Sequence, residues 1–154
     1  MNKIMPEQVG KSGLDLIRHF EGFQPHVYTC PGGMPTIGFG HVVKEGETFE
    51  QPMSVQQAYD LLKEDVKFVE KALQDTVKVP LTIYQFDALS SLIYNIGVGA
   101  WEKSNFLKRL NDKEDYYEVS SEFLRWVFAG SKRLRGLMRR RETERQLFIK
   151  GVMQ

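Results

Sequence analysis

The stretch that decides the fold reads Glu21-Gly-Phe-Gln-Pro-His-Val-Tyr-Thr-Cys30-Pro-Gly-Gly-Met-Pro-Thr36-Ile-Gly-Phe-Gly-His41. Apolar residues at helical spacing lead up to Glu21, and short β-prone runs separated by glycine and proline turns follow it. The pattern predicts a helix that ends near Gly22, followed by a small antiparallel sheet. A carboxylic acid, a thiol and a hydroxyl would then lie close together, so Glu21, Cys30 and Thr36 are candidate active-site residues.

The order and spacing of these three residues resemble the phage-type lysozymes of glycoside hydrolase family 24. That family has Glu, Asp and Thr in this order, so Glu21 and Thr36 match while Cys30 stands where most relatives carry aspartate. Further segments resemble the family in the family's order: Leu61-Leu-Lys-Glu-Asp65, Val79-Pro-Leu81, Gln85-Phe-Asp-Ala-Leu89, Tyr94-Asn-Ile-Gly97 and Arg139-Arg-Arg-x-x-Glu144-Arg145. The resemblance therefore covers nearly the whole chain.

The resemblance implies an endolysin-like muramidase. Such an enzyme hydrolyses the β-1,4 bond between N-acetylmuramic acid and N-acetylglucosamine in bacterial peptidoglycan and serves host cell lysis. In the implied roles Glu21 is the acid, Cys30 is the base or the nucleophile, and Thr36 positions water. Each of the last two residues also has a purely structural explanation. Cys30 could be a small buried thiol that takes no part in chemistry, and Thr36 could be a β-branched residue that favours a strand.

Two other functions stay open because the usual carboxylate is missing. A lytic transglycosylase needs a single acid/base glutamate, so a poor base at Cys30 would suit it. A peptidoglycan-binding protein that kept the cleft and lost turnover is the alternative outside enzymes. Reducing ends, 1,6-anhydro-muramyl ends or no products at all would separate the three.

The resemblance also implies a substrate cleft walled by Val42, Tyr94 and Ser104, with Asn95 nearby. Arg140 or Arg141 is implied to pair with Glu21. From the residues themselves, Gly38 and Gly40 could let the sheet backbone approach a sugar. His41 is interpreted as a structural hydrogen-bonding or ion-pairing residue. With His19, His26, His41 and one cysteine as the soft ligands, we expect neither a metal nor another cofactor.

The chain has 154 residues and the composition of an ordinary globular protein. We expect an α+β fold in a single lysozyme-like domain over residues 1–154, with a sheet lobe at about 22–50, a long linking helix at about 54–75 and a helical lobe at about 80–154. Capping-box patterns begin at Ser54 and Thr82. Behind a glycine-rich turn at 95–100, we expect only helices, at 105–110, 116–128 and 137–152.

Charge is unevenly distributed along the chain. Residues 1–102 carry about −5 and residues 103–154 about +6, which favours an acidic polymer as partner or, equally, a solvated face with internal ion pairs. Glu142 and Glu144 lie among the arginines of this second part, which argues against nucleic acid as the partner. We expect a monomer that acts on peptidoglycan.

The start of the sequence predicts the compartment. The first ten residues have no apolar signal region, and no run approaches the roughly 20 apolar residues of a membrane span. A single cysteine forms no internal disulfide. The family resemblance implies accumulation in the host cytoplasm until a separate holin-type pore protein gives access to the wall.

Overall fold

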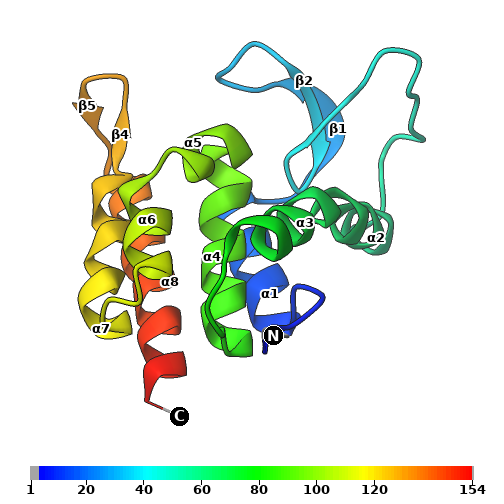
Figure 1. Ribbon diagram of the computed structural model, residues 1–154. Helices are drawn as coiled ribbons and strands as arrows, with labels where there is room; N and C mark the ends of the chain where they lie inside the picture. Colours follow the sequence, from blue (N-terminus) through cyan, green and yellow to red (C-terminus); the bar gives the residue numbers. More distant parts are fainter. Residues whose placement is uncertain (1–3, 154) are drawn as a thin grey trace.

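The structure, a computed structural model, describes residues 4–153 and is mainly helical with two small antiparallel sheets (Figure 1). Its elements are α1 (Lys11–Glu21), β1 (Gln24–Thr29), β2 (Pro35–Gly38), β3 (His41–Val42), α2 (Val55–Asp65), α3 (Lys67–Thr76), α4 (Ile83–Ile96), α5 (Val98–Glu102), α6 (Asn105–Asn111), α7 (Tyr116–Val119), the 3-10 helix η1 (Ser120–Arg125), β4 (Phe128–Ala129), β5 (Lys132–Arg133) and α8 (Arg135–Val152). The expected α+β class is confirmed. Residues 1–3 and 154 of the expected domain lie outside the described residues.

The first helix ends as the sequence predicts. Gly22 takes φ +74°, which favours glycine, and its N–H donates to the carbonyl of Arg18. The chain then enters a three-stranded antiparallel sheet in the order β1-β2-β3, with Tyr28 opposite Thr36 and Ile37 opposite His41. The sheet therefore places Cys30, directly after β1, on the same hairpin as Thr36.

The start of α1 is fixed from a distant part of the chain. Its N-cap residue, Gly10, has no side chain, and the carboxylate of Asp87 from α4 takes that role. Asp87 accepts the N–H groups of Gly10 at 2.8 Å and Gly13 at 2.9 Å, together with the hydroxyl of Ser12. Burial raises the pKa of Asp87. The central helix thus anchors the helix that ends at Glu21.

The expected linking helix at about 54–75 is two helices, so that prediction is wrong in its continuity. The capping box of Ser54 and Gln57 starts α2 as predicted, but α2 ends at Asp65 and α3 begins after the buried Val66. The two helices pack on different neighbours, since α2 contacts β2 and β3 while α3 contacts α4 and α5. The apolar stripe continues through the bend because Val66 keeps it facing the core.

The second half of the chain also departs from the expectation of helices alone. The capping box of Thr82 and Gln85 starts α4 as predicted. The glycine-rich turn shrinks to Gly97, at φ +92°, between α4 and α5. The helix expected at 116–128 is instead α7 followed by η1, and Phe128 begins a short hairpin whose turn contains Gly130 at φ +63°.

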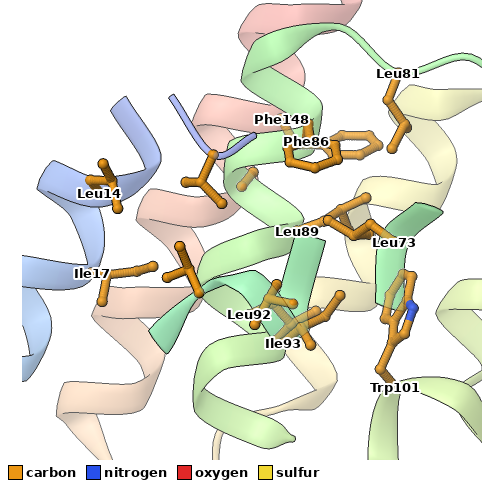
Figure 2. Close-up of a cluster of buried hydrophobic side chains, with 14 of the residues drawn as sticks. Leu14, Ile17, Leu73, Leu81, Phe86, Leu89, Leu92, Ile93, Trp101 and Phe148 are labelled. Carbon is orange, nitrogen blue, oxygen red and sulfur yellow. The ribbon is translucent and has the colours of Figure 1, made fainter. Parts of the chain in front are cut away.

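The central helix α4 forms the middle of the core. Residues Gln85 to Ile93 of α4 are all buried, and the helix packs against α1, α3 and α8. Figure 2 shows the labelled core side chains around α4: Leu14, Ile17, Leu73, Leu81, Phe86, Leu89, Leu92, Ile93, Trp101 and Phe148. The buried central helix predicted at this place is confirmed. Within residues 4–153, no helix combines the length and apolar character that crossing a bilayer requires.

Candidate active site

Glu21, the last residue of α1, lies in a cleft of about 510 Å³. The side chain is 22% exposed, and its Oε2 accepts a hydrogen bond from Arg140 Nη1 at 2.7 Å. The cleft is lined by Glu21, Gly40, His41, Val42, Lys44, Glu64, Asp65, Phe68, Tyr94 and Asn95. The carboxylate is therefore both reachable from solvent and held by a cation.

Arg140 is itself anchored in a buried polar network. Its Nε lies 3.3 Å from Glu144 Oε2, and its Nη2 donates to the carbonyl of Ser91 at 3.2 Å. Glu144 is 0% exposed and also pairs with Arg141 Nη1 at 2.7 Å. The implied pairing of the acid with Arg140 or Arg141 is thus made by Arg140.

Arg141 stabilises the wall of the cleft. Its Nε donates to the carbonyl of Trp126 at 2.8 Å, and its Nη2 donates to the side-chain oxygen of Asn95. Burial lowers the pKa of Arg141, and the charge of Glu144 opposes that effect. Arg141 therefore orients Asn95, a residue of the cleft, while the hydrogen bond to Glu21 comes from Arg140.

Gly40 brings the sheet against the acid. Its φ is +87°, and a Cβ at this position would lie 2.8 Å from Glu21 Oε1. A Cβ at Gly38 would meet Met53 and Ala58 at 3.4 Å instead. The sequence interpretation placed a sugar beside these glycines, whereas the structure places the catalytic candidate itself beside Gly40 and the start of α2 beside Gly38.

Cys30 occupies the turn that joins β1 to β2. Its N–H donates to the carbonyl of Met34 at 2.9 Å, and its carbonyl accepts the N–H of Gly33 at 2.8 Å. The thiol is partly exposed, so the alternative of a buried thiol at this position is wrong. A hydrogen bond from the Thr36 side chain lowers the pKa of Cys30, and a backbone hydrogen bond from Met34 lowers it further.

Thr36 is 3% exposed and donates its hydroxyl to the carbonyl of Met34 at 3.0 Å. A hydroxyl has one hydrogen to donate. The same hydrogen can therefore serve Met34 while Cys30 is neutral and turn to the sulfur once the thiolate forms. This local arrangement favours the charged form of the thiol.

Tyr28 connects the acid and the thiol electrostatically. Burial raises the pKa of its phenol, and the negative charges of Cys30 and Glu21 raise it further. Tyr28 also pairs with Thr36 across the strands. Tyr28 thus feels the charges of both Glu21 and Cys30 and lies opposite Thr36 in the sheet, although the sequence analysis assigns it no role.

His41 is a structural residue, as the sequence indicates. Its Nδ1 lies 2.8 Å from Asp65 and its Nε2 lies 2.9 Å from Glu47. Burial lowers the pKa of His41, but the hydrogen bonds and charges of Glu47 and Asp65 outweigh burial and raise it. The imidazole thereby ties β3 to the end of α2 below the cleft.

The implied substrate-binding residues divide into two groups. Val42, Tyr94 and Asn95 line the cleft, and the Tyr94 hydroxyl donates to the carbonyl of Phe39 at 3.1 Å. Ser104 is not among the residues that line this cleft. It caps α6, where its hydroxyl accepts the N–H of Leu107 and donates to the carbonyl of Trp101. Phe68 also lines the cleft, although no sequence pattern points to it. Its ring is half exposed and stacks on Tyr94 with the ring centroids 6.4 Å apart.

Comparison with known proteins places this geometry in a family. The sequence profile described as "Phage lysozyme" matches residues 18–144, which include Glu21, Cys30, Thr36 and Arg140. The chain belongs to the phage lysozyme family. As a member, it is a glycoside hydrolase of the lysozyme type, and its relatives support a phage endolysin.

Two phage relatives span almost the same length as this chain. An endolysin of Acyrthosiphon pisum secondary endosymbiont phage 1 is 40% identical over 91% of this chain and 97% of its own. An endolysin of Salmonella phage P22 is 39% identical over 92% and 98%. A solved structure of a P22 lysozyme variant superposes with a TM-score of 0.82 at 38% identity, covering 92% of this chain and 98% of that one.

Proposed function

We propose that this phage lysozyme hydrolyses the β-1,4 bond between N-acetylmuramic acid and N-acetylglucosamine with Glu21, Cys30 and Thr36 as its working residues. The observation that supports the proposal most strongly is the position of the Glu21 carboxylate. It lies in an open cleft, bonds to Arg140 and packs against Gly40. Glycoside hydrolysis needs an acid beside the leaving oxygen, and Glu21 can reach a polymer in this cleft.

In the proposed reaction Glu21 protonates the oxygen that leaves, and the thiolate of Cys30 serves the attacking side. As a base, the thiolate takes a proton from water and the resulting hydroxide attacks the sugar. As a nucleophile, it attacks the sugar itself and water later releases the product. The hydrogen bonds from Thr36 and Met34 support either role because they lower the pKa of the thiol.

Val42, Tyr94 and Asn95 are proposed to bind the glycan, because all three line the cleft with Glu21. Ser104 is proposed to act indirectly, since its cap fixes the start of α6. We further propose that the protein is a monomer that accumulates in the host cytoplasm and that a separate holin-type protein opens its route to peptidoglycan. The absence of a cofactor requirement is part of the same proposal.

Cleavage of purified sacculi by wild type and Glu21→Gln tests the function. We expect wild type to clear the sacculi and to leave reducing ends, and Glu21→Gln to be at least about a thousandfold slower, because the proton donor is gone. Glu142→Gln, which changes an exposed carboxylate that lines neither this cleft nor the site of the acid, is the control and should keep activity.

The products decide between the alternatives. 1,6-Anhydro-muramyl ends in the mass spectrum would show a lytic transglycosylase. Binding of sacculi without clearing by wild type would show a peptidoglycan-binding protein. Full activity of Glu21→Gln would end the glycosidase proposal itself.

A further inference from the structure

Glu21 lies between two clefts. Besides the first cleft, toward β3 and α3, it lines a second one of about 500 Å³ formed with Phe20, Asn95, Leu134, Arg135, Gly136, Leu137 and Arg140. Glu21 and Asn95 belong to both. A polymer that crosses the acid can therefore continue into the second cleft. Apart from Glu21, Asn95 and Arg140, its lining residues have no role implied by the family resemblance.

The two clefts differ in charge. Away from Glu21, the first contains both signs, with Glu64 and Asp65 opposed by Lys44 and His41. The second contains only cations, Arg135 and Arg140. Away from Glu21, a ligand in the second cleft consequently meets positive charge beside the apolar side chains of Phe20, Leu134 and Leu137.

The two cations of the second cleft are not equally available. Arg140 is 5% exposed and already bonds Glu21, Glu144 and Ser91. Arg135 is exposed, and among residues 4–153 the structure records no hydrogen bond or ion pair for its side chain. Its guanidinium has five donors in a planar fork that suits a carboxylate.

The cationic surface extends beyond this single side chain. Lys132 and Arg133 on β5 directly precede the second cleft and are exposed, also without a recorded ion pair in the described residues. Figure 1 shows the β4–β5 hairpin and the β1–β2 strands at the same end of the molecule. Positive charge at the mouth of the second cleft raises the local concentration of an anionic polymer.

We infer that the second cleft binds the carboxylate-bearing muramyl unit of peptidoglycan and that Arg135 pairs with this carboxylate. This inference rests on the proposed function and adds a residue that recognises the muramyl unit. The muramyl units of peptidoglycan carry carboxylates on their stem peptides, or on the lactyl group itself where no peptide is attached, whereas N-acetylglucosamine is neutral. The charge of the second cleft thus favours a muramyl unit over N-acetylglucosamine at this position.

Binding of soluble peptidoglycan fragments tests the inference. The measurements use the Glu21→Gln protein, so that fragments stay intact, with and without Arg135→Gln, and Arg139→Gln on the same helix as the exposed control. Each protein is titrated with native fragments and with fragments of the same length whose carboxylates are converted to amides. A third ligand has its peptides removed, which frees the lactyl carboxylate that the peptide's amide bond otherwise occupies.

We expect Arg135→Gln to weaken binding of native fragments roughly three- to tenfold and to leave amidated fragments unaffected, because only the native ligand offers the charge partner. Arg139→Gln should change binding less than about twofold. A difference that persists on peptide-free fragments shows that Arg135 also pairs with a free lactyl carboxylate, and a difference lost with the peptide assigns a peptide carboxylate.

An equal effect of Arg135→Gln on native and amidated fragments, or no effect on either, would overturn the inference. Unchanged circular dichroism and an unchanged unfolding midpoint confirm that the variant is folded. The two proposals can be refuted separately. If wild type does not cleave sacculi, the proposed function is wrong. If wild type cleaves sacculi but Arg135→Gln does not change binding, only the proposed pairing of Arg135 with a carboxylate is wrong.

Discussion

Glu21 meets two regions of the molecule that are built in opposite ways. On the α8 side, Arg140 and Glu144 are 4% and 0% exposed and form a network with Ser91 of α4. On the sheet side, Cys30 is partly exposed and its recorded bonds stay within its own hairpin. The first region depends on helices that are distant in sequence, and the second depends on a few neighbouring residues.

The two regions should therefore respond differently to substitution. The position of the Glu21 carboxylate is set by buried side chains, so changes on the α8 side should lower both stability and activity. The charge state of the thiol is a local property, so changes around Cys30 should cost activity while the fold survives.

The largest effect on stability is expected from Glu144→Ala. The substitution leaves Arg140 and Arg141 buried without their shared counter-ion, which should lower the free energy of unfolding by about 3–5 kcal/mol. Denaturant unfolding measures the loss. Glu142→Ala, exposed on the same helix, should change it by less than about 0.5 kcal/mol. Equal losses in both variants would show that the network does not support the fold.

Gly40→Ala tests the contact between the sheet and the acid. The variant is strained at φ +87°, and its Cβ would push against the Glu21 carboxylate. Gly46→Ala is the control, since its φ of +82° brings the same strain with nothing within 4 Å. Both should lose about 1–2 kcal/mol of stability, but only Gly40→Ala should lose activity on sacculi, roughly tenfold or more. Equal activities would contradict a functional contact.

Thr36→Val tests the local control of the thiol and should have little effect on folding. Removing the hydroxyl removes the first cause of the lowered pKa of Cys30. The pKa should therefore rise toward the ordinary value of about 8.5. This pKa can be measured from the ultraviolet absorbance of the thiolate as a function of pH, because the chain has one cysteine.

The control for that titration is Thr29→Val, an exposed position on β1 beside the same turn. It should leave the pKa of Cys30 unchanged. A titration curve that is the same for Thr36→Val and wild type would refute the hydrogen bond as the cause.

The sequence predicted the features that depend on neighbouring residues. The caps at Ser54 and Thr82 and the glycine that ends α1 were identified because a few adjacent side chains determine them. The proposed trio of Glu21, Cys30 and Thr36 is a prediction of the same kind, since it follows from the spacing of these residues on one helix end and one hairpin.

Features that depend on tertiary partners were missed. The bend at Val66 follows from α2 and α3 packing on different elements, and the apolar stripe carries no sign of it. The choice of Arg140 over Arg141 depends on the rotation of α8 against α4. Asp87 looked like an ordinary residue of an apolar helix, although it caps α1 from a distance of more than 70 residues. Gly130 was the available signal for the missed hairpin.

The pH dependence of sacculus clearing by wild type, Cys30→Asp and Cys30→Ala tests the central claim, that Cys30 works on the attacking side opposite Glu21. The thiolate is the active form, so wild-type activity should rise with pH through the lowered pKa of Cys30. Because a carboxylate ionises at lower pH, Cys30→Asp should be active with its optimum moved to lower pH. Cys30→Ala should fail to clear sacculi at every pH, and wild-type activity in Cys30→Ala would contradict the account.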